Sequence, residues 1–169
     1  MKKTALLLAL VVGMLTTGCA GQTNEELESY KESMTKFYNE LSGYNDAINN
    51  IDPNSEGAKS ELLGYLDNMN ESYKTMAQVQ IPEEFSGISD IAVEAADYMQ
   101  MADEFYHQAY DNDFDEESEA LASQYYQRAN NRVLVMLQVL HGEVPSGEGI
   151  TVTTQEAYQF STIAASTEE

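Results

Sequence analysis

The stretch from Asn24 to Ile51, NEELESYKESMTKFYNELSGYNDAINNI, carries two apolar rows in which each residue follows the last by seven positions. The rows are Leu27, Met34, Leu41 and Ile48, and Tyr30, Phe37, Tyr44 and Ile51. Their alternating spacing of three and four is typical of a coiled-coil packing stripe. A capping box, Thr23-Asn24-Glu25-Glu26, places the helix start near Asn24, and Asp52-Pro53 ends it. The stretch predicts a long helix with one face buried against other helices.

Three further helical segments follow, separated by short breaks. Asp52 as a cap and Pro53 in the first turn predict a second helix that runs to about Val79. Pro82 opens a third, whose alanine-rich rows predict the close approach of a neighbouring helix. The fourth runs from about Asp115 to His141, where Gly142 and Pro145 stop it.

Four long helices with short connections favour an all-α fold, an up-down-up-down antiparallel four-helix bundle over residues 24–142. Residues 143–169 form a loosely structured tail, with a short strand at Ile150–Val152 and a short final helix as the alternative to fraying. In this topology the turns at Asn50–Ser55 and Asp111–Glu117 lie at the same end. The acids expected to gather there are Asp46, Asp52, Glu56, Asp111, Asp113, Asp115, Glu116, Glu117 and Glu119.

The N-terminal segment has the layout of an export signal. Lys2 and Lys3 precede eleven apolar residues, Ala5 to Leu15, whereas a membrane-spanning helix needs about 20. Gly18 and the chain's single cysteine, Cys19, follow, and here residues 1–19 resemble a bacterial lipoprotein signal. The resemblance implies a signal peptide over residues 1–18 and a lipidated tether over 19–23, with Cys19 carrying diacylglycerol and palmitate. An ordinary secretory signal that contains a cysteine is the alternative.

This anchor would hold the protein on the extracytoplasmic side of a bacterial cell membrane, with membrane lipid as its first partner. The chain has 8 basic and 29 acidic residues and a net charge of −21. Nucleic-acid binding requires a basic footprint, so the charge excludes that class of partner. Removal of residues 1–18 takes away Lys2 and Lys3 and leaves 6 basic residues against 29 acidic ones, a net charge of −23.

The acidic turn between the third and fourth helices is a candidate cation site formed by Asp111, Asp113, Asp115 and Glu117. The alternating oxygens resemble the start of a calcium loop. The pattern then departs from that loop, because Glu116, Ser118 and Ala122 stand where Gly, an apolar residue and Glu are required. A solvated turn whose acids favour the next helix N-terminus is the simpler interpretation.

Glu104 and His107 match the Glu-x-x-His spacing of di-iron bundles. Those sites need a second such pair, but the other histidine, His141, has Gln138 three residues before it. We therefore expect an exposed Glu104, a helix-face His107, no di-iron site and no cofactor.

Tyrosine is abundant, with eleven residues, of which we expect Tyr30, Tyr44, Tyr73, Tyr98 and Tyr125 to line the seams between helices. Tyr38, Tyr65, Tyr110 and Tyr126 lie off or near the edge of the main rows and are the candidate partner-binding surface. No nucleophile elbow, Ser-His-Asp motif or phosphate loop is visible, so we expect no enzyme. The predicted function is non-enzymatic binding or scaffolding of a protein or cell-envelope partner. The alternative is a small-ligand or divalent-cation-binding lipoprotein that uses the acidic turns.

Overall fold

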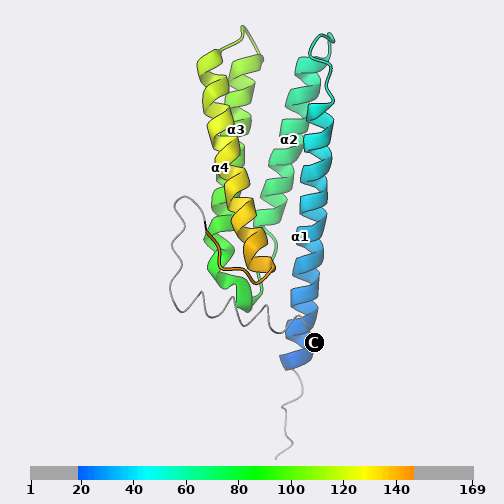
Figure 1. The fold of residues 1–169 in the computed structure, drawn as a ribbon, viewed down its shortest axis with the longest axis vertical. Coiled ribbons are helices and arrows are strands. Elements are labelled where there is room, and N and C mark those ends of the chain that lie inside the picture. The colour runs from blue at the N-terminus through cyan, green and yellow to red at the C-terminus, as the bar shows by residue number, and fades with distance from the viewer. Residues whose placement is uncertain (1–18, 147–169) are drawn as a thin grey trace, which may run out of the picture.

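The computed structural model describes residues 19–146, with side chains from residue 25 onward except that of Glu84. Four α-helices run up and down in antiparallel order, and within residues 19–146 no strand is formed (Figure 1). The elements are α1 (Cys19–Asn49), α2 (Ala58–Ala77), the 3-10 helix η1 (Glu83–Ile88), α3 (Ser89–Tyr110) and α4 (Glu116–Leu140). The predicted bundle is confirmed. The predicted signal peptide, the Cys19 side chain and the tail segment 147–169 lie outside what is described.

The predicted apolar rows form the core. On α1, Tyr30, Met34, Phe37 and Leu41 are buried. The buried residues that meet them from the other elements include Leu66, Met69, Tyr73, Met76, Phe85, Ile88, Met99, Val133, Met136 and Val139. Because these side chains recur at helical spacing on each element, burying them aligns the four axes and fixes which face of each helix points inward.

Several helix boundaries differ from the predictions. α1 begins at Cys19 rather than near Asn24, because extending an existing helix is easier than starting a new one, so residues 19–23 are helical. α2 begins at Ala58, not at Pro53. The Asp52 carboxylate accepts from the backbone N–H of Asn54 at 3.0 Å and so stabilises a local turn rather than a helix start. The segment after Pro82 is a 3-10 helix that precedes α3.

Two other boundaries match the predictions. Asp115 is the N-cap of α4, where its side chain accepts from the Glu117 backbone N–H at 3.2 Å. Gly142 follows α4 with a φ of 70°, a left-handed conformation that favours glycine and ends the helix.

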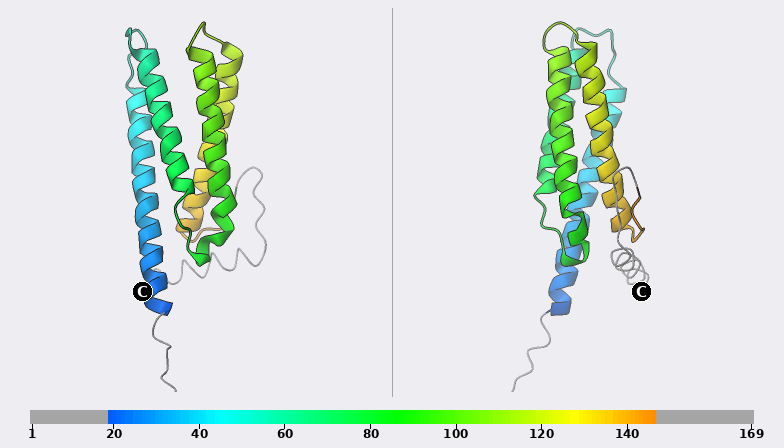
Figure 2. Two further views of the ribbon diagram at one scale, coloured as in Figure 1. Left: turned by 180° about the vertical axis from the view of Figure 1, so that it is seen from behind. Right: turned by 90° about the vertical axis from the view of Figure 1, so that its left-hand side faces the viewer.

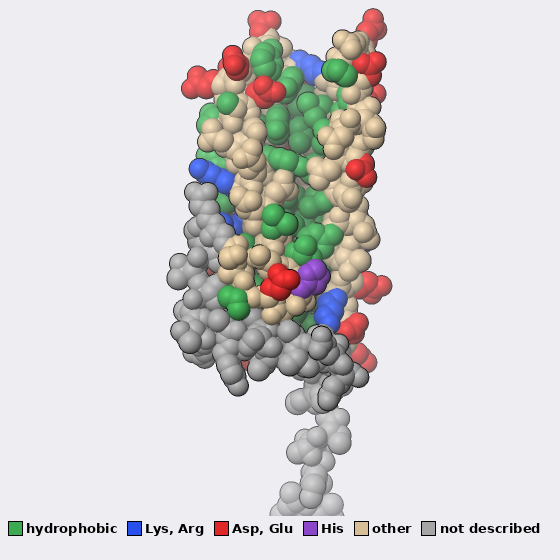
Figure 3. Space-filling view, viewed as in Figure 1, with side chains coloured by type: hydrophobic (Ala, Val, Ile, Leu, Met, Phe, Trp, Pro, Cys, Tyr) green, Lys and Arg blue, Asp and Glu red, His purple; other side chains and the backbone are tan. Residues whose placement is uncertain are grey.

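The helices pair unequally. α3 and α4 make the most extensive contact, as the buried Ala92, Ala95, Ala102 and Ala129 allow, whereas α1 and α4 approach only sparsely. Figure 2 shows the chain as two hairpins, α1–α2 and α3–α4, set side by side. Tyrosines bridge the sparse contact between α1 and α4. The Tyr38 hydroxyl on α1 donates to the Val133 carbonyl of α4 at 3.2 Å. Apolar side chains line the visible part of this seam (Figure 3).

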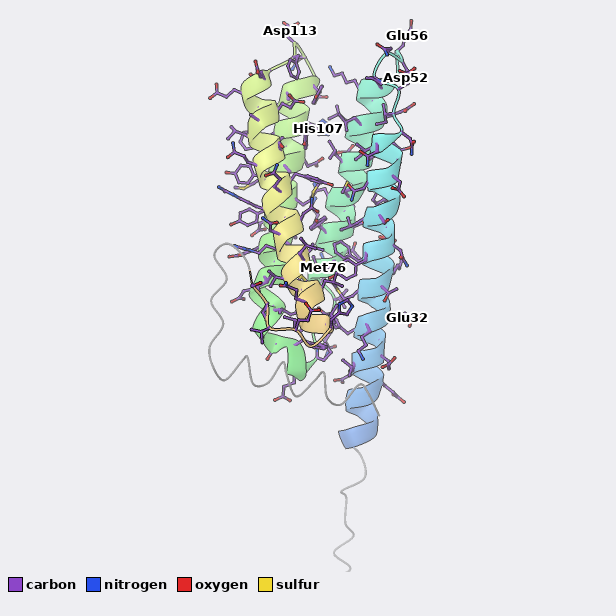
Figure 4. The ribbon with its side chains drawn as sticks, in the orientation of Figure 1. Glu32, Asp52, Glu56, Met76, His107 and Asp113 are labelled. Atoms are coloured by element: carbon purple, nitrogen blue, oxygen red, sulfur yellow. The ribbon has the colours of Figure 1, made fainter. Side chains whose placement is uncertain are left out.

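The turn between α1 and α2 and the turn between α3 and α4 both lie at the end of the bundle opposite the start of α1. Figure 4 shows Asp52 and Glu56 beside one turn and Asp113 in the other, all at the same end of the bundle. The Lys59 ammonium links the two turns by donating to the Asn112 carbonyl at 3.4 Å. The predicted gathering of acidic turns at one end is confirmed. Within residues 19–146, no helix is both long and apolar enough to span a bilayer.

Candidate functional site

A group of polar side chains interrupts the apolar interface between α2 and α3. We name it the α2–α3 polar cluster and define it as Asp67, Asn70, Asp103 and His107. Asp67 and Asn70 are three residues apart on α2, and Asp103 and His107 are four apart on α3, so each pair occupies one helix face. One ligand atom each from Asp67, Asp103 and His107 lies within 4.8 Å of the other two. The cluster therefore brings two carboxylates and an imidazole to one point.

Asp103 and Asn70 form the buried floor of the cluster. Only 8% of Asp103 and 6% of Asn70 is exposed. The Asn70 amide donates from Nδ2 to Asp103 Oδ2 at 2.7 Å. Asp103 Oδ1 and Asn70 Oδ1 are buried without a hydrogen-bond donor. An unsatisfied buried acceptor costs about 1–3 kcal/mol, and more when it is charged, so the floor is unfavourable as it stands.

His107 forms the partly exposed side of the cluster and lies between two carboxylates. Its Nε2 is 3.0 Å from Asp67 Oδ1, and its Nδ1 is 3.0 Å from Asp111 Oδ2. A neutral imidazole has one N–H and can donate to only one of them. The second contact requires either a second proton on the ring or a cation shared with the carboxylate.

The electrostatics of the cluster are dominated by negative charge. Burial raises the pKa of Asp103 above its ordinary value, although the hydrogen bond from Asn70 opposes this shift. Burial would lower the pKa of His107, but its hydrogen bonds to Asp67 and Asp111 outweigh that effect and the pKa is raised. Three carboxylates thus surround one imidazole, which favours any additional positive charge.

A solvent-accessible cavity of about 470 Å³ leads to the cluster from the loop end. Asp67, His107 and Asp111 line it together with Glu56, Lys59, Ser60, Leu63 and Gly64. Asp103 does not line the cavity and lies deeper in the interface. The cavity therefore reaches the exposed side of the cluster, while Asp103 lies outside it in the buried interface.

The four acids of the predicted cation site do not converge in this way. Asp111 pairs with His107, and Asp115 caps α4, while Asp113 and Glu117 are exposed. Over residues 19–146, the group whose ligand atoms could surround one ion is Asp67, Asp103 and His107. Of the predicted four, only Asp111 contacts that group.

The four candidate surface tyrosines are all half-buried, and three use their hydroxyl groups inside the bundle. Tyr38 donates to Val133, Tyr126 donates to Asn45 Oδ1 at 2.6 Å, and Tyr110 donates to Glu119. The Tyr65 ring lies 6.5 Å from the ring of Tyr44. These side chains form contacts between parts of the bundle. Partner binding by them stays a prediction.

Sequence reasoning singled out His107 but paired it with Glu104, which is exposed and accepts a hydrogen bond from Gln100 at 2.9 Å. It missed Asp103, Asn70 and Asp67. A signal was present, since Asp103 lies four residues after Met99 in the buried stripe of α3 and four before His107. A charged residue within an apolar stripe is the unusual observation.

Comparison of the chain with protein-family models, with curated proteins and with solved structures finds no match.

Proposed function

We propose that this protein is a lipid-anchored, extracytoplasmic binding or scaffolding protein of the bacterial cell surface, without enzymatic activity. One observation supports this proposal above the others: the first residue of α1, Cys19, lies at one pole and both acidic turns lie at the other (Figures 1 and 4). An acyl chain on Cys19 would hold the first pole at the membrane. The acidic pole would then be the part of the bundle offered outward.

The chemistry of that pole favours a cationic partner. The exposed carboxylates of the two turns include Asp52, Glu56, Asp113 and Glu116, and Lys59 is the basic residue that links the turns. A concentrated negative surface speeds association with a basic protein or cell-envelope component and disfavours anionic partners. Binding of this kind weakens as ionic strength rises, which provides a test.

The anchor is tested first, by Cys19→Ala in the full chain. We expect the parent protein to fractionate with membranes and to incorporate labelled palmitate, and the variant to be released as a folded helical protein. Circular dichroism verifies the fold. A Cys19→Ala protein that stays in the membrane fraction would contradict the anchor on which the proposal depends.

The acidic pole is tested by cross-linking on intact cells. We expect Asp52→Asn combined with Asp113→Asn to reduce a specific cross-linked product several-fold, and added salt to do the same. The matched control is Asp97→Asn combined with Glu71→Gln, which removes two exposed acids from the helix sides. Equal loss in both double variants would show that the pole is not the binding surface.

The alternative function, cation or small-ligand binding by Asp111, Asp113, Asp115 and Glu117, has less support. Two of these four carboxylates already serve His107 and the α4 cap. Calcium titration of Asp113→Asn tests this alternative, because the substitution would weaken calcium binding at the turn and leave the α2–α3 polar cluster intact.

A further inference from the structure

We propose that the α2–α3 polar cluster binds a divalent transition-metal ion, with Asp67, Asp103 and His107 as protein ligands. The inference does not depend on the proposed surface function, because the cluster lies within the helical interface rather than on the acidic turns.

The first argument is the buried, unpartnered oxygen of Asp103. Asp103 is only 8% exposed, contributes one of the converging ligand atoms, and has one buried oxygen, Oδ1, with no donor. Stability alone would favour an apolar residue or an amide at this position. A bound cation would give this oxygen a positive partner, and Asn70 Oδ1 is a second buried acceptor without a donor.

The second argument is the orientation of His107. Metal-binding histidines commonly donate the N–H of their other ring nitrogen to a carboxylate, which fixes the tautomer and leaves the ligand nitrogen unprotonated. Asp111 Oδ2 stands 3.0 Å from Nδ1 and is placed to accept that proton. The unprotonated Nε2 then faces Asp67 Oδ1, and two acceptors at 3.0 Å are compatible when a cation lies between them.

The third argument is distance. Ligands about 2.0–2.2 Å from a tetrahedral metal lie about 3.3–3.6 Å from one another. The ligand atoms of the three residues already lie within 4.8 Å of one another, and one pair is at 3.0 Å, so side-chain adjustments of about an ångström complete the geometry. Asp67 is exposed and His107 partly so, which leaves both free to adjust and leaves a coordination position open to water from the cavity.

The ligand set indicates the class of metal. One imidazole and two carboxylates suit zinc or manganese, whereas calcium takes an all-oxygen shell of six to eight ligands. The chain's other histidine, His141, follows the end of α4 at the base of the bundle, away from this group. We therefore expect a single Zn²⁺ or Mn²⁺ per chain, with Ca²⁺ bound far more weakly.

The test is a titration of the untagged full chain carrying Cys19→Ala, which removes the only thiol. Isothermal titration with Zn²⁺, Mn²⁺ and Ca²⁺ in separate runs measures affinity and stoichiometry, and melting curves report metal-dependent stabilisation. We expect one Zn²⁺ or Mn²⁺ per chain and a higher melting temperature. Asp103→Asn and His107→Gln should each remove binding, and Asp111→Asn, which removes the carboxylate that orients the histidine, should weaken it about 10–100-fold.

Matched controls keep the test specific. Glu104→Gln removes the neighbouring exposed acid and His141→Gln removes the other imidazole, and both should bind as the parent does. Asp103→Asn is isosteric and should fold without metal at least as well as the parent. The proposal is overturned if neither Zn²⁺ nor Mn²⁺ binds, or if the controls lose binding as much as the ligand variants. Binding lost on Asp113→Asn instead would assign the ion to the acidic turn and also overturn it.

Discussion

The base of the bundle and its loop end bury different chemistry along the same two helices. On α2, Met76 and Tyr73 belong to the base, and Asn70 and then Asp67 follow toward the loop end. On α3, Met99 is followed one turn later by Asp103 and another turn later by His107. Figure 4 shows Met76 near the base and His107 nearer the acidic turns. About halfway along the bundle polar side chains enter the inward faces, where Leu66, Leu63 and Ala102 are still buried beside them.

The apolar base stabilises the fold, whereas the loop end presents polar groups that a ligand could use. Apolar burial at the base removes surface from water and requires no specific partner. At the loop end, the interface between the same helices buries two oxygens that have no hydrogen-bond donor. It also places the His107 imidazole between two carboxylates. Residues that lower stability and converge on a cavity are more informative about function than those that raise it.

The largest effect is expected at the base, from Phe85→Ala. Phe85 in η1 is fully buried, and its ring lies 5.7 Å from that of Tyr30, so it closes the base of the core. Truncation leaves a cavity and should lower the free energy of unfolding by about 3–5 kcal/mol. Urea unfolding followed by circular dichroism measures it. Phe114→Ala, at an exposed aromatic in the acidic turn, is the control and should change stability little. A similar loss in both variants would contradict a base-centred core.

A smaller effect is expected from alkaline pH through Tyr30, also at the base. Burial raises the pKa of the Tyr30 hydroxyl to about 12. Between pH of about 10 and about 12 the unfolded chain loses this proton while the folded chain keeps it, so stability falls as pH rises. Each pKa unit corresponds to about 1.4 kcal/mol, which predicts a loss of about 2–3 kcal/mol that Tyr30→Phe removes.

The measurement for Tyr30 is the difference in unfolding free energy between parent and variant across that pH range. At neutral pH the Tyr30→Phe protein should be as stable as the parent or slightly more so, because the Tyr30 hydroxyl is buried without a partner. Tyr65→Phe, at a half-exposed position on α2, is the control. A parent and Tyr30→Phe variant that lose stability in parallel would show that Tyr30 does not titrate as proposed.

The base was largely predictable from sequence, and the loop end was not. The seven-residue rows through Tyr30 and Phe37 specify a buried helical face by period alone. A polar cluster across two helices depends on their relative register, and Asp67 and His107 are 40 residues apart. Periodicity within one helix carries no information about that register. The start of α2 was mispredicted because Pro53 and Asp52 fit a helix start as well as the turn that they form.

The smallest effect is expected from Asn70→Ala at the loop end. The substitution removes the donor to Asp103 Oδ2 and leaves the buried carboxylate without any hydrogen bond. Because the pKa of Asp103 is already raised, the carboxyl group can take up a proton and limit the loss to about 1–2 kcal/mol, measured by urea unfolding without metal.

The partner variant gives the opposite sign. Asp103→Asn keeps the shape and removes the buried charge, so stability without metal should be unchanged or increased by up to about 1 kcal/mol. A buried acid whose removal stabilises the fold is retained for a reason other than folding. If Asp103→Asn instead destabilises the protein as much as Asn70→Ala, the cluster stabilises the fold. The base and the loop end would then differ in residue composition but not in role.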